Sequence, residues 1–291
     1  MAVFNTLGEI RRLVTGPNLA PGHRSAVTIA ISAQKGGVGK TTTAVHLASG
    51  LAMYQGLKVL LIDMDAQGHV DTSILSHISN DNRDTMGHLL LQKRRELHEI
   101  ATATRIKGLW RVPSDKALNH TEAQMASRIG RELLLKRALR LTRTHYDLII
   151  IDCPPNMGSL TINALVAADL VLTPCDLSLL SLDGVENLLD AVESIRDTLN
   201  PELKILGLLR TRVDRRNQKV NAAIEETLKH RYGGLVLETD IGVSTAIAKA
   251  QLSGQTVFSF DEKCRAAIHY KALAAEVVAR IRREGKMLLP C

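Results

Sequence analysis

Aromatic residues and paired cysteines are scarce in this sequence. Aromatics make up only 3% of the 291 residues, so a folded core has to be built from Leu, Val, Ile and Ala. The four cysteines, at positions 153, 175, 264 and 291, form no C-x-x-C pair. This spacing argues against a disulfide framework and against a zinc site. It favours a reducing cytoplasm as the compartment.

Long apolar runs are also absent. No window approaches the roughly 20 apolar residues of a membrane span, and residues 1–16 lack the uninterrupted apolar stretch of a secretory signal. With 45% apolar and 23% charged residues, the composition excludes disorder over most of the chain. The net charge of +7 fits a nucleic-acid or anionic-membrane partner, and it fits a soluble enzyme equally well.

The order of patterns along the chain predicts one α/β domain with short extensions. Residues 1–26 read as an N-terminal extension, with a short amphipathic helix near residues 4–14 and a Pro- and Gly-rich linker. Residues 27–284 form the predicted domain, and residues 285–291 a short tail. Short apolar runs predict strands at 27–33, 58–63, 108–114, 146–152, 169–174, 205–212 and 235–241. Helical spacing predicts helices at 41–54, 128–143, 181–199 and 217–231. In the helix at 128–143, Leu133, Leu134 and Leu141 should face the core.

Strands that alternate with helices predict a mostly parallel central sheet with helices on both faces. Residues 68–108 are more polar, and we expect short helices there. In sheets of this class the ligand binds at the carboxyl ends of the strands. Three motifs lie at such ends.

The first motif is A-Q-K-G-G-V-G-K-T-T, between a predicted strand and a predicted helix. This is the context that a phosphate-binding loop requires. Its glycines allow the backbone to wrap closely around phosphates, and the backbone amides of residues 38–42 would point inward at the helix N-terminus. Lys40 would neutralise β- and γ-phosphate oxygens, and the Thr41 hydroxyl would ligate Mg²⁺. The predicted nucleotide-binding residues are Lys35, Gly36, Gly37, Val38, Gly39, Lys40, Thr41 and Thr42.

The loop departs from the usual pattern G-x-x-x-x-G-K-[ST]. Gln34 stands where that pattern has its first glycine, and Lys35 adds a second lysine. The other two motifs supply carboxylates. Asp63 ends the predicted strand L-L-I-D and Asp65 follows two residues later, and together they predict a water and metal site beside the phosphate loop. Asp152 ends the apolar run Y-D-L-I-I-I-D, where a carboxylate would hold a Mg²⁺-bound water.

Together, K-G-G-V-G-K-T-T, L-L-I-D-M-D-A-Q-G and Y-D-L-I-I-I-D-C-P-P-N-M-G-S-L resemble the ParA/MinD family of P-loop ATPases with a deviant Walker A motif. The resemblance is strongest to the ParA (Soj) partition branch and extends from about residue 27 to residue 282. It implies a weak ATPase with ATP and Mg²⁺ as cofactors and an ATP-dependent homodimer. A ParB-like or cargo-adaptor activator would stimulate hydrolysis.

The resemblance also implies roles for individual residues. Lys35 would reach the phosphates of the partner subunit, and Asp65 would orient the attacking water. Asp63 and Asp152 would support Mg²⁺ together with Thr41. The catalytic set is therefore Lys35, Lys40 and Asp65. The family's ATP dimer binds DNA without sequence preference, which implies a cytoplasmic protein associated with the nucleoid.

DNA binding requires cations that contact phosphates. The segment R-T-R-V-D-R-R-N-Q-K is the best candidate, and its predicted DNA-binding residues are Arg210, Arg212, Arg215, Arg216 and Lys219. Solvated or ion-paired side chains are the alternative interpretation, and part of the segment could face the adenine. The family commonly has I-P-R-N-V-R near residues 241–246, where this chain has I-G-V-S-T-A without arginine.

The C-terminal segment raises the possibility of a MinD-like protein that cycles on a membrane. Tyr270, Leu273, Ala274, Val277 and Ile281 form an apolar stripe with basic residues after it. The stripe is mostly Ala and Val, which favours a helix packed on the core over a membrane-binding helix. Membrane binding is therefore the less favoured function. An iron–sulfur or metal-delivery ATPase of the same fold is a third hypothesis, and it lacks the required cysteine pair.

Overall fold

The computed structural model describes residues 25–78, 84–92, 95–216 and 218–286. Its centre is an eight-stranded sheet in the order β3-β4-β2-β5-β1-β6-β7-β8. Every pairing is parallel except that of β3 with β4. The strands are β1 (Val27–Ile31), β2 (Val59–Asp63), β3 (Thr102–Ala103), β4 (Leu109–Val112), β5 (Leu148–Asp152), β6 (Leu170–Asp176), β7 (Lys204–Val213) and β8 (Val236–Gly242). This confirms the predicted α/β class and the mostly parallel sheet.

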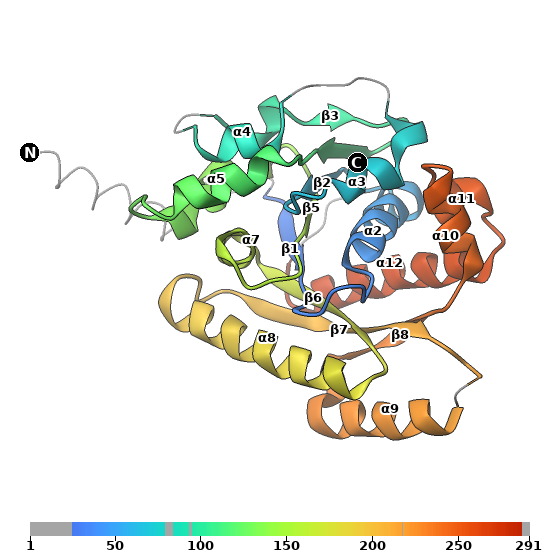
Figure 1. Ribbon diagram of the computed structural model, residues 1–291. Helices are drawn as coiled ribbons and strands as arrows, with labels where there is room; N and C mark the ends of the chain where they lie inside the picture. The colour runs from blue at the N-terminus through green and yellow to red at the C-terminus, as the bar shows by residue number, and fades with distance from the viewer. Residues whose placement is uncertain (1–24, 79–83, 93–94, 217, 287–291) are drawn as a thin grey trace, which may run out of the picture.

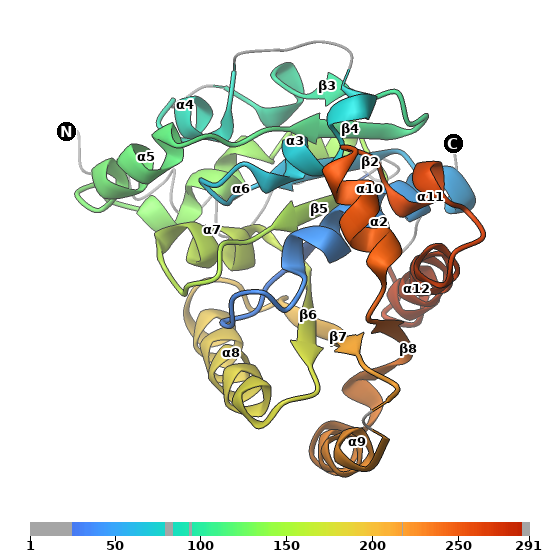
Figure 2. The same cartoon turned by 45° about the vertical axis from the view of Figure 1, so that its right-hand side comes forward.

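Helices cover both faces of the sheet (Figure 1). They are α2 (Lys40–Gln55), α3 (His69–Ser73), α4 (Met86–Leu90), α5 (Ala117–Met125), α6 (Leu134–Ala138), α7 (Ser159–Ala167), α8 (Leu179–Thr198), α9 (Gln218–Tyr232), α10 (Thr245–Leu252), α11 (Val257–Phe260) and α12 (Arg265–Arg283). One core layer joins the sheet to α2 and α12, and a second joins it to α4–α7. The helices α8 and α9 lie beside the β6–β8 part of the sheet (Figure 2).

The central strands are short apolar runs that are buried along their whole length. Every residue of β1, β2 and β5 is buried, as expected of parallel strands covered on both faces. Strand β1 lies between β5 and β6, and β5 also pairs with β2. In this register Asp63 and Ile31 both lie opposite Asp152. The loops that follow β1, β2 and β5 therefore begin side by side at one edge of the sheet.

One predicted helix differs from the structure. Residues 128–143 form a 3₁₀ turn (Arg131–Leu133), the short helix α6 and a second 3₁₀ turn (Thr142–Thr144) instead of one continuous helix. Gly130 has a φ of +71°, so the chain begins this region from a left-handed turn. Leu133 and Leu134 face the core as predicted, but Leu141 is 42% exposed. The prediction for Leu141 was wrong because the helix ends before that residue.

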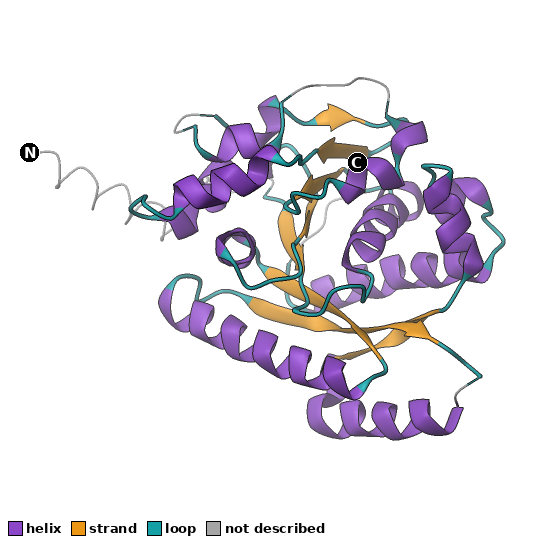
Figure 3. Ribbon diagram, viewed as in Figure 1, coloured by secondary structure: helices purple, strands orange, loops and turns teal. Residues whose placement is uncertain are grey.

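Several elements between the motifs had no individual prediction, among them α5, α7, α10, α11 and the edge strand β3 (Figure 3). The short helices expected within residues 68–108 are present as α3 and α4. The helix predicted near residues 4–14 lies outside the described residues, as do Asn217, at the predicted start of α9, and Cys291.

The last helix packs on the core. The stripe predicted from the sequence is buried against α2 and β8, and its residues Tyr270, Leu273, Ala274, Val277 and Ile281 are each at most 1% exposed. Beside this stripe, Arg280 donates to the carbonyls of Leu206, Gly234 and Val236. The apolar face of this helix is therefore part of the domain.

Candidate functional site

The phosphate loop lies between β1 and α2, as its motif predicted. Gly37 and Gly39 have φ values of +75° and +89°, a left-handed conformation that a residue with a Cβ rarely adopts. Gly39 is the N-cap of α2. The first turn of this helix lies within the described residues, and it has neither a capping side chain nor an acidic residue. The amides at the start of α2 are thus available to an anion.

Lys40 is the first residue of α2, and its side chain is buried beneath the loop. Its Nζ donates to the Lys35 carbonyl oxygen over 3.0 Å. Burial lowers the pKa of Lys40, and the negative charge of Asp152 opposes this effect. A buried ammonium group with too little negative charge around it, beside free backbone amides, is suited to bind phosphate oxygens.

Two carboxylates from adjacent strands, Asp63 and Asp152, lie beside the loop. Both residues are fully buried. Burial raises the pKa of Asp63 well above its ordinary value, and the neighbouring Asp152 raises it further. Burial raises the pKa of Asp152 to about 7, while Thr41 and Lys40 act in the opposite direction. Two buried carboxyls that disfavour each other's charge are suited to a cation.

The hydrogen bonds distinguish the two carboxyls. The Asp63 carboxylate accepts from the backbone N–H of Asp65 at 2.9 Å and of Val70 at 3.2 Å, so it organises the loop from β2 to α3. Neither oxygen of Asp152 accepts a hydrogen bond of good geometry from the described residues. The Thr41 hydroxyl lies close enough to lower the pKa of Asp152 without satisfying its carboxylate.

This donor set fits Mg²⁺, which takes oxygen ligands, retains several waters and uses one or two carboxylates with substrate phosphates. Asp152 offers orphaned carboxylate oxygens, and Thr41 offers a hydroxyl at the start of α2. Asp63 would contact the ion through a bound water, because its carboxylate already accepts hydrogen bonds from two amides. Among the described residues, no group of three or more His, Cys, Asp or Glu side chains is arranged as a metal cage.

Asp65 stands at the open side of the site and is only half-buried. Within the described part of the chain, its carboxylate accepts one hydrogen bond, from the Gln67 amide at 3.1 Å. Its charge acts on both Lys40 and Asp152, so it lies near the predicted phosphate position. Of the two aspartates in the D-x-D pair, Asp65 has the freer carboxylate.

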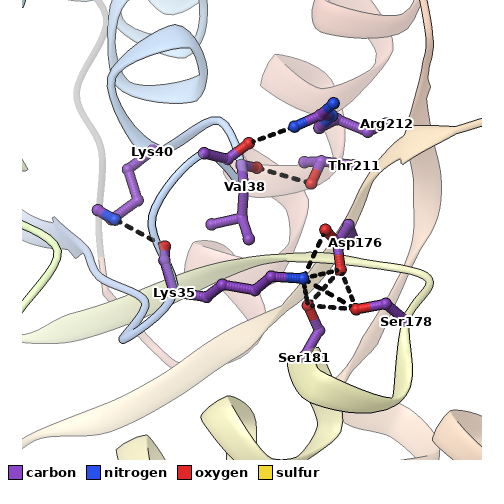
Figure 4. Close-up of polar contacts among 9 residues, drawn as sticks. Lys35, Val38, Lys40, Asp176, Ser178, Ser181, Thr211 and Arg212 are labelled. Carbon is purple, nitrogen blue, oxygen red and sulfur yellow. Dashed lines mark hydrogen bonds and ion pairs between the residues drawn. The ribbon is translucent and has the colours of Figure 1, made fainter.

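The second lysine of the loop points away from Lys40 (Figure 4). The Nζ of Lys35 contacts the end of β6 and the start of α8, where it donates to both oxygens of Asp176, at 2.9 and 3.1 Å. It also donates to the Ser178 hydroxyl at 2.9 Å. No local pattern in the sequence pointed to Asp176, because 141 residues separate it from Lys35.

The end of β7 supports the loop from another side (Figure 4). The Thr211 hydroxyl donates to the Val38 carbonyl at 2.7 Å, and the Arg212 guanidinium donates to the Gly37 carbonyl at 3.0 Å. Arg212 has a φ of +53°, which is uncommon for a residue other than glycine. Backbone strain of this kind is concentrated at functional sites. Arg212 was predicted to contact DNA, and the structure shows it in contact with the phosphate loop.

The other predicted DNA-binding residues separate into two groups. Arg210 is only 7% exposed, pairs with Glu225 at 3.0 Å, and donates to two carbonyls of β8. Its prediction as a DNA contact does not agree with this burial, because the guanidinium is used within the fold. The side chains of Arg215 and Arg216 are 65% and 86% exposed. Lys219 lies on α9, and its side chain is outside the described part of the structure.

Known proteins are similar to this chain in sequence and in fold. A family profile described as an AAA domain matches residues 26–205. The sporulation initiation inhibitor protein Soj of Bacillus subtilis is 38% identical, covering 86% of this chain and 98% of Soj. The chromosome partitioning protein ParA of Caulobacter vibrioides is 35% identical, covering 87% and 94% of the two chains.

A solved structure extends the comparison to the fold. Cobyrinic acid a,c-diamide synthase from Mycobacterium smegmatis, with a bound ATP analog and magnesium, is 31% identical. Its TM-score is 0.75, and the match covers 91% of this chain and 99% of that chain. The matched sequences, the shared fold and the phosphate loop with its strand-end aspartates lead to one conclusion: this chain belongs to the ParA/MinD family of P-loop ATPases.

Proposed function

We propose that this chain is a ParA-like ATPase that ATP and Mg²⁺ drive into a homodimer. The dimer binds DNA without sequence preference, and a ParB-like or cargo-adaptor protein stimulates hydrolysis. This cycle positions a plasmid, a chromosome or a protein cargo, and it would associate the protein with the nucleoid. The names of two relatives, a chromosome partitioning protein and Soj, support a partition role.

The observation that carries the proposal is the different environment of the two loop lysines. Lys40 is buried and directed at the phosphate cradle beside Asp152. Lys35 is half-buried, and its side chain extends to the opposite side of the loop, toward α8 (Figure 4). One lysine is suited to the subunit's own nucleotide, and the other to a nucleotide held by a second subunit.

The three carboxylates have different roles in hydrolysis. Phosphoryl transfer depends on positioning and on charge stabilisation, with water held in line with the γ-phosphate. Asp65 orients this water, since its carboxylate lies at the open side of the site and is half-buried, whereas Asp63 and Asp152 are fully buried. Asp63 fixes the loop that carries Asp65. Mg²⁺, which Thr41 and Asp152 would hold, would neutralise charge on the β- and γ-phosphates.

The proposed DNA contacts are Arg215 and Arg216, which lie just beyond β7 and are well exposed. Arg216 pairs with Asp214 over 2.7 Å, and Arg215 lies 3.7 Å from Asp240. The Arg216 guanidinium holds the pKa of Asp214 down at about 2, so the Asp214 charge persists at any working pH. Such exposed pairs are weak, and DNA phosphates can compete for the arginines.

A MinD-like membrane cycle is the alternative. The stripe on α12 from which such a cycle would be built is buried in the core, which favours the DNA-bound form. Across the described residues, no helix combines the length and the apolar character needed to cross a bilayer.

The test is the oligomeric state measured by light scattering with Mg-ATP, with Mg-ADP and without nucleotide. We expect a dimer with Mg-ATP and a monomer in the other two conditions. The variant Asp65→Ala should accumulate the dimer because it retains ATP. A monomer at millimolar Mg-ATP for both proteins would contradict the proposal. ATP-dependent sedimentation with anionic liposomes but not with DNA would favour the membrane alternative.

A further inference from the structure

The contacts of Lys35 form a closed polar cluster on the subunit's own α8. Asp176 is the last residue of β6, and Ser178 is the N-cap residue of α8. Besides its bonds to Asp176 and Ser178, the Lys35 Nζ lies 3.5 Å from the Ser181 hydroxyl. The Ser178 hydroxyl donates to Asp176 at 2.6 Å, and the Ser181 hydroxyl also donates to this carboxylate. The lysine therefore has a complete set of acceptors within its own subunit.

The cluster is partly sheltered from water. The side chains of Lys35 and Asp176 are 31% and 20% exposed. Burial alone would raise the pKa of Asp176, but the two serine hydroxyls and Lys35 hold it below its ordinary value. The carboxylate is thus ionised throughout the physiological range and pairs with a full positive charge.

Lys35 cannot hold this cluster and bind a phosphate on another subunit at the same time. Its ammonium has three N–H donors, and here they are directed at Asp176 and Ser178 with Ser181 close by. A lysine that reached a phosphate on another subunit would have to give up these contacts. The strength of this cluster would then oppose dimerisation.

We propose that Asp176, with Ser178 and Ser181, is the intrasubunit acceptor of Lys35 and competes with the partner subunit's nucleotide for this lysine. Asp176 is a positioning residue, since it acts only through Lys35. Dimerisation has to break one Lys35–Asp176 pair in each subunit, and this requirement raises the ATP and protein concentrations at which the dimer forms. The inference rests on the proposed function, because it assigns Lys35 a role across a dimer.

The size of the effect follows from the exposure of the pair. A partly exposed ion pair favours its bound state by up to about fivefold, and the competent fraction of each subunit falls by that factor. A symmetric dimer needs two released lysines. The penalty on the dimerisation constant is then up to about 25-fold.

The experiment measures dimerisation constants by sedimentation velocity in Mg-ATP at one fixed salt concentration. Asp176→Asn removes the charge with almost no change in shape. It should tighten the dimer by at least about threefold and at most about 25-fold. Asp183→Asn is the matched control, since it makes the same change at an exposed position near the start of the same helix. This control should leave the constant unchanged.

Two further measurements keep the result interpretable. ATP affinity of the dilute monomer should be the same in Asp176→Asn and in the unmodified protein, because the pair does not face the subunit's own phosphate cradle. The double variant Ser178→Ala, Ser181→Ala should shift dimerisation in the same direction by a smaller factor. It also replaces Asp176→Asn if that variant does not fold.

The outcomes separate the two hypotheses. An unmodified protein that dimerises with ATP, together with an equal or weaker dimer for the folded Asp176→Asn, overturns this inference and leaves the proposed function intact. No dimer for any of the proteins overturns the proposed function and this inference with it. A tighter dimer for Asp176→Asn alone, with Asp183→Asn unchanged, supports both.

Discussion

Asp65 and Asp63 are two residues apart, and we predict that their replacement affects different properties: hydrolysis for Asp65 and stability for Asp63. In Asp65→Ala, the one hydrogen bond lost among the described residues is that which its half-buried carboxylate accepts from the Gln67 amide. The free energy of unfolding should fall by no more than about 1 kcal/mol. Hydrolysis should fall by about 100- to 1000-fold, the scale of a positioned group that acts on the attacking water. ATP binding and dimerisation should persist.

In Asp63→Ala, two amides beneath the loop lose their acceptor. The N–H group of Val70 is buried and that of Asp65 is partly buried, and the loss of their acceptor costs about 1–3 kcal/mol each. Removal of a buried carboxylate whose pKa is already raised offsets part of this loss. We expect a net loss of roughly 2–4 kcal/mol in the free energy of unfolding, with a weaker Mg²⁺-dependent nucleotide complex.

The assays are urea unfolding and single-turnover hydrolysis of ATP with enzyme in excess. Asp65→Asn is a matched variant, because its amide oxygen can still accept from Gln67 while the charge is gone. It should hydrolyse as slowly as Asp65→Ala. Near-normal turnover by Asp65→Ala would refute the assignment of the water to this residue. An Asp63→Ala protein as stable as the unmodified one would refute the structural role of Asp63.

The remaining predictions concern the cations. Lys40→Ala should abolish ATP binding in a titration, and retained micromolar affinity would contradict its place in the phosphate cradle. Lys35→Ala should keep most of this affinity and lose the ATP-dependent dimer in light scattering. Arg210→Met should lower the free energy of unfolding by about 1–3 kcal/mol, measured in urea, because the buried Leu237 carbonyl loses its donor and the partly exposed Glu225 loses its ionic partner. Replacing Arg215 and Arg216 by Glu should leave stability within about 0.5 kcal/mol and weaken DNA binding uniformly across sequences; unchanged affinity would place the contact elsewhere.

Local signals in the sequence predicted the nucleotide site and the sheet around it. The glycines of the phosphate loop and the strand-end aspartates Asp63 and Asp152 are each visible within ten residues of sequence. Their convergence follows from parallel strand order, because the carboxyl ends of neighbouring strands lie at one edge. The structure agrees, since Asp63 and Asp152 are partners in register.

The basic segment shows where local patterns stop being sufficient. In a regular strand, Arg210 and Arg212 would lie on the same side of β7. The fold instead buries Arg210 against Glu225 and turns Arg212, at a positive φ, onto the phosphate loop. Both outcomes depend on elements that are distant in sequence. The same is true of the contact between Lys35 and Asp176, which requires β1 and β6 to be neighbours.

The central claim is that nucleotide controls DNA binding, and its most direct test is the affinity for a labelled duplex of arbitrary sequence. Fluorescence anisotropy would be recorded with Mg-ATP and with Mg-ADP over a series of salt concentrations. We predict tight binding with Mg-ATP only, equal for unrelated sequences. The logarithm of affinity should fall against the logarithm of salt concentration with a slope of about −0.9 per phosphate contact. Equal affinity with Mg-ATP and Mg-ADP, or no binding with either, would contradict the account.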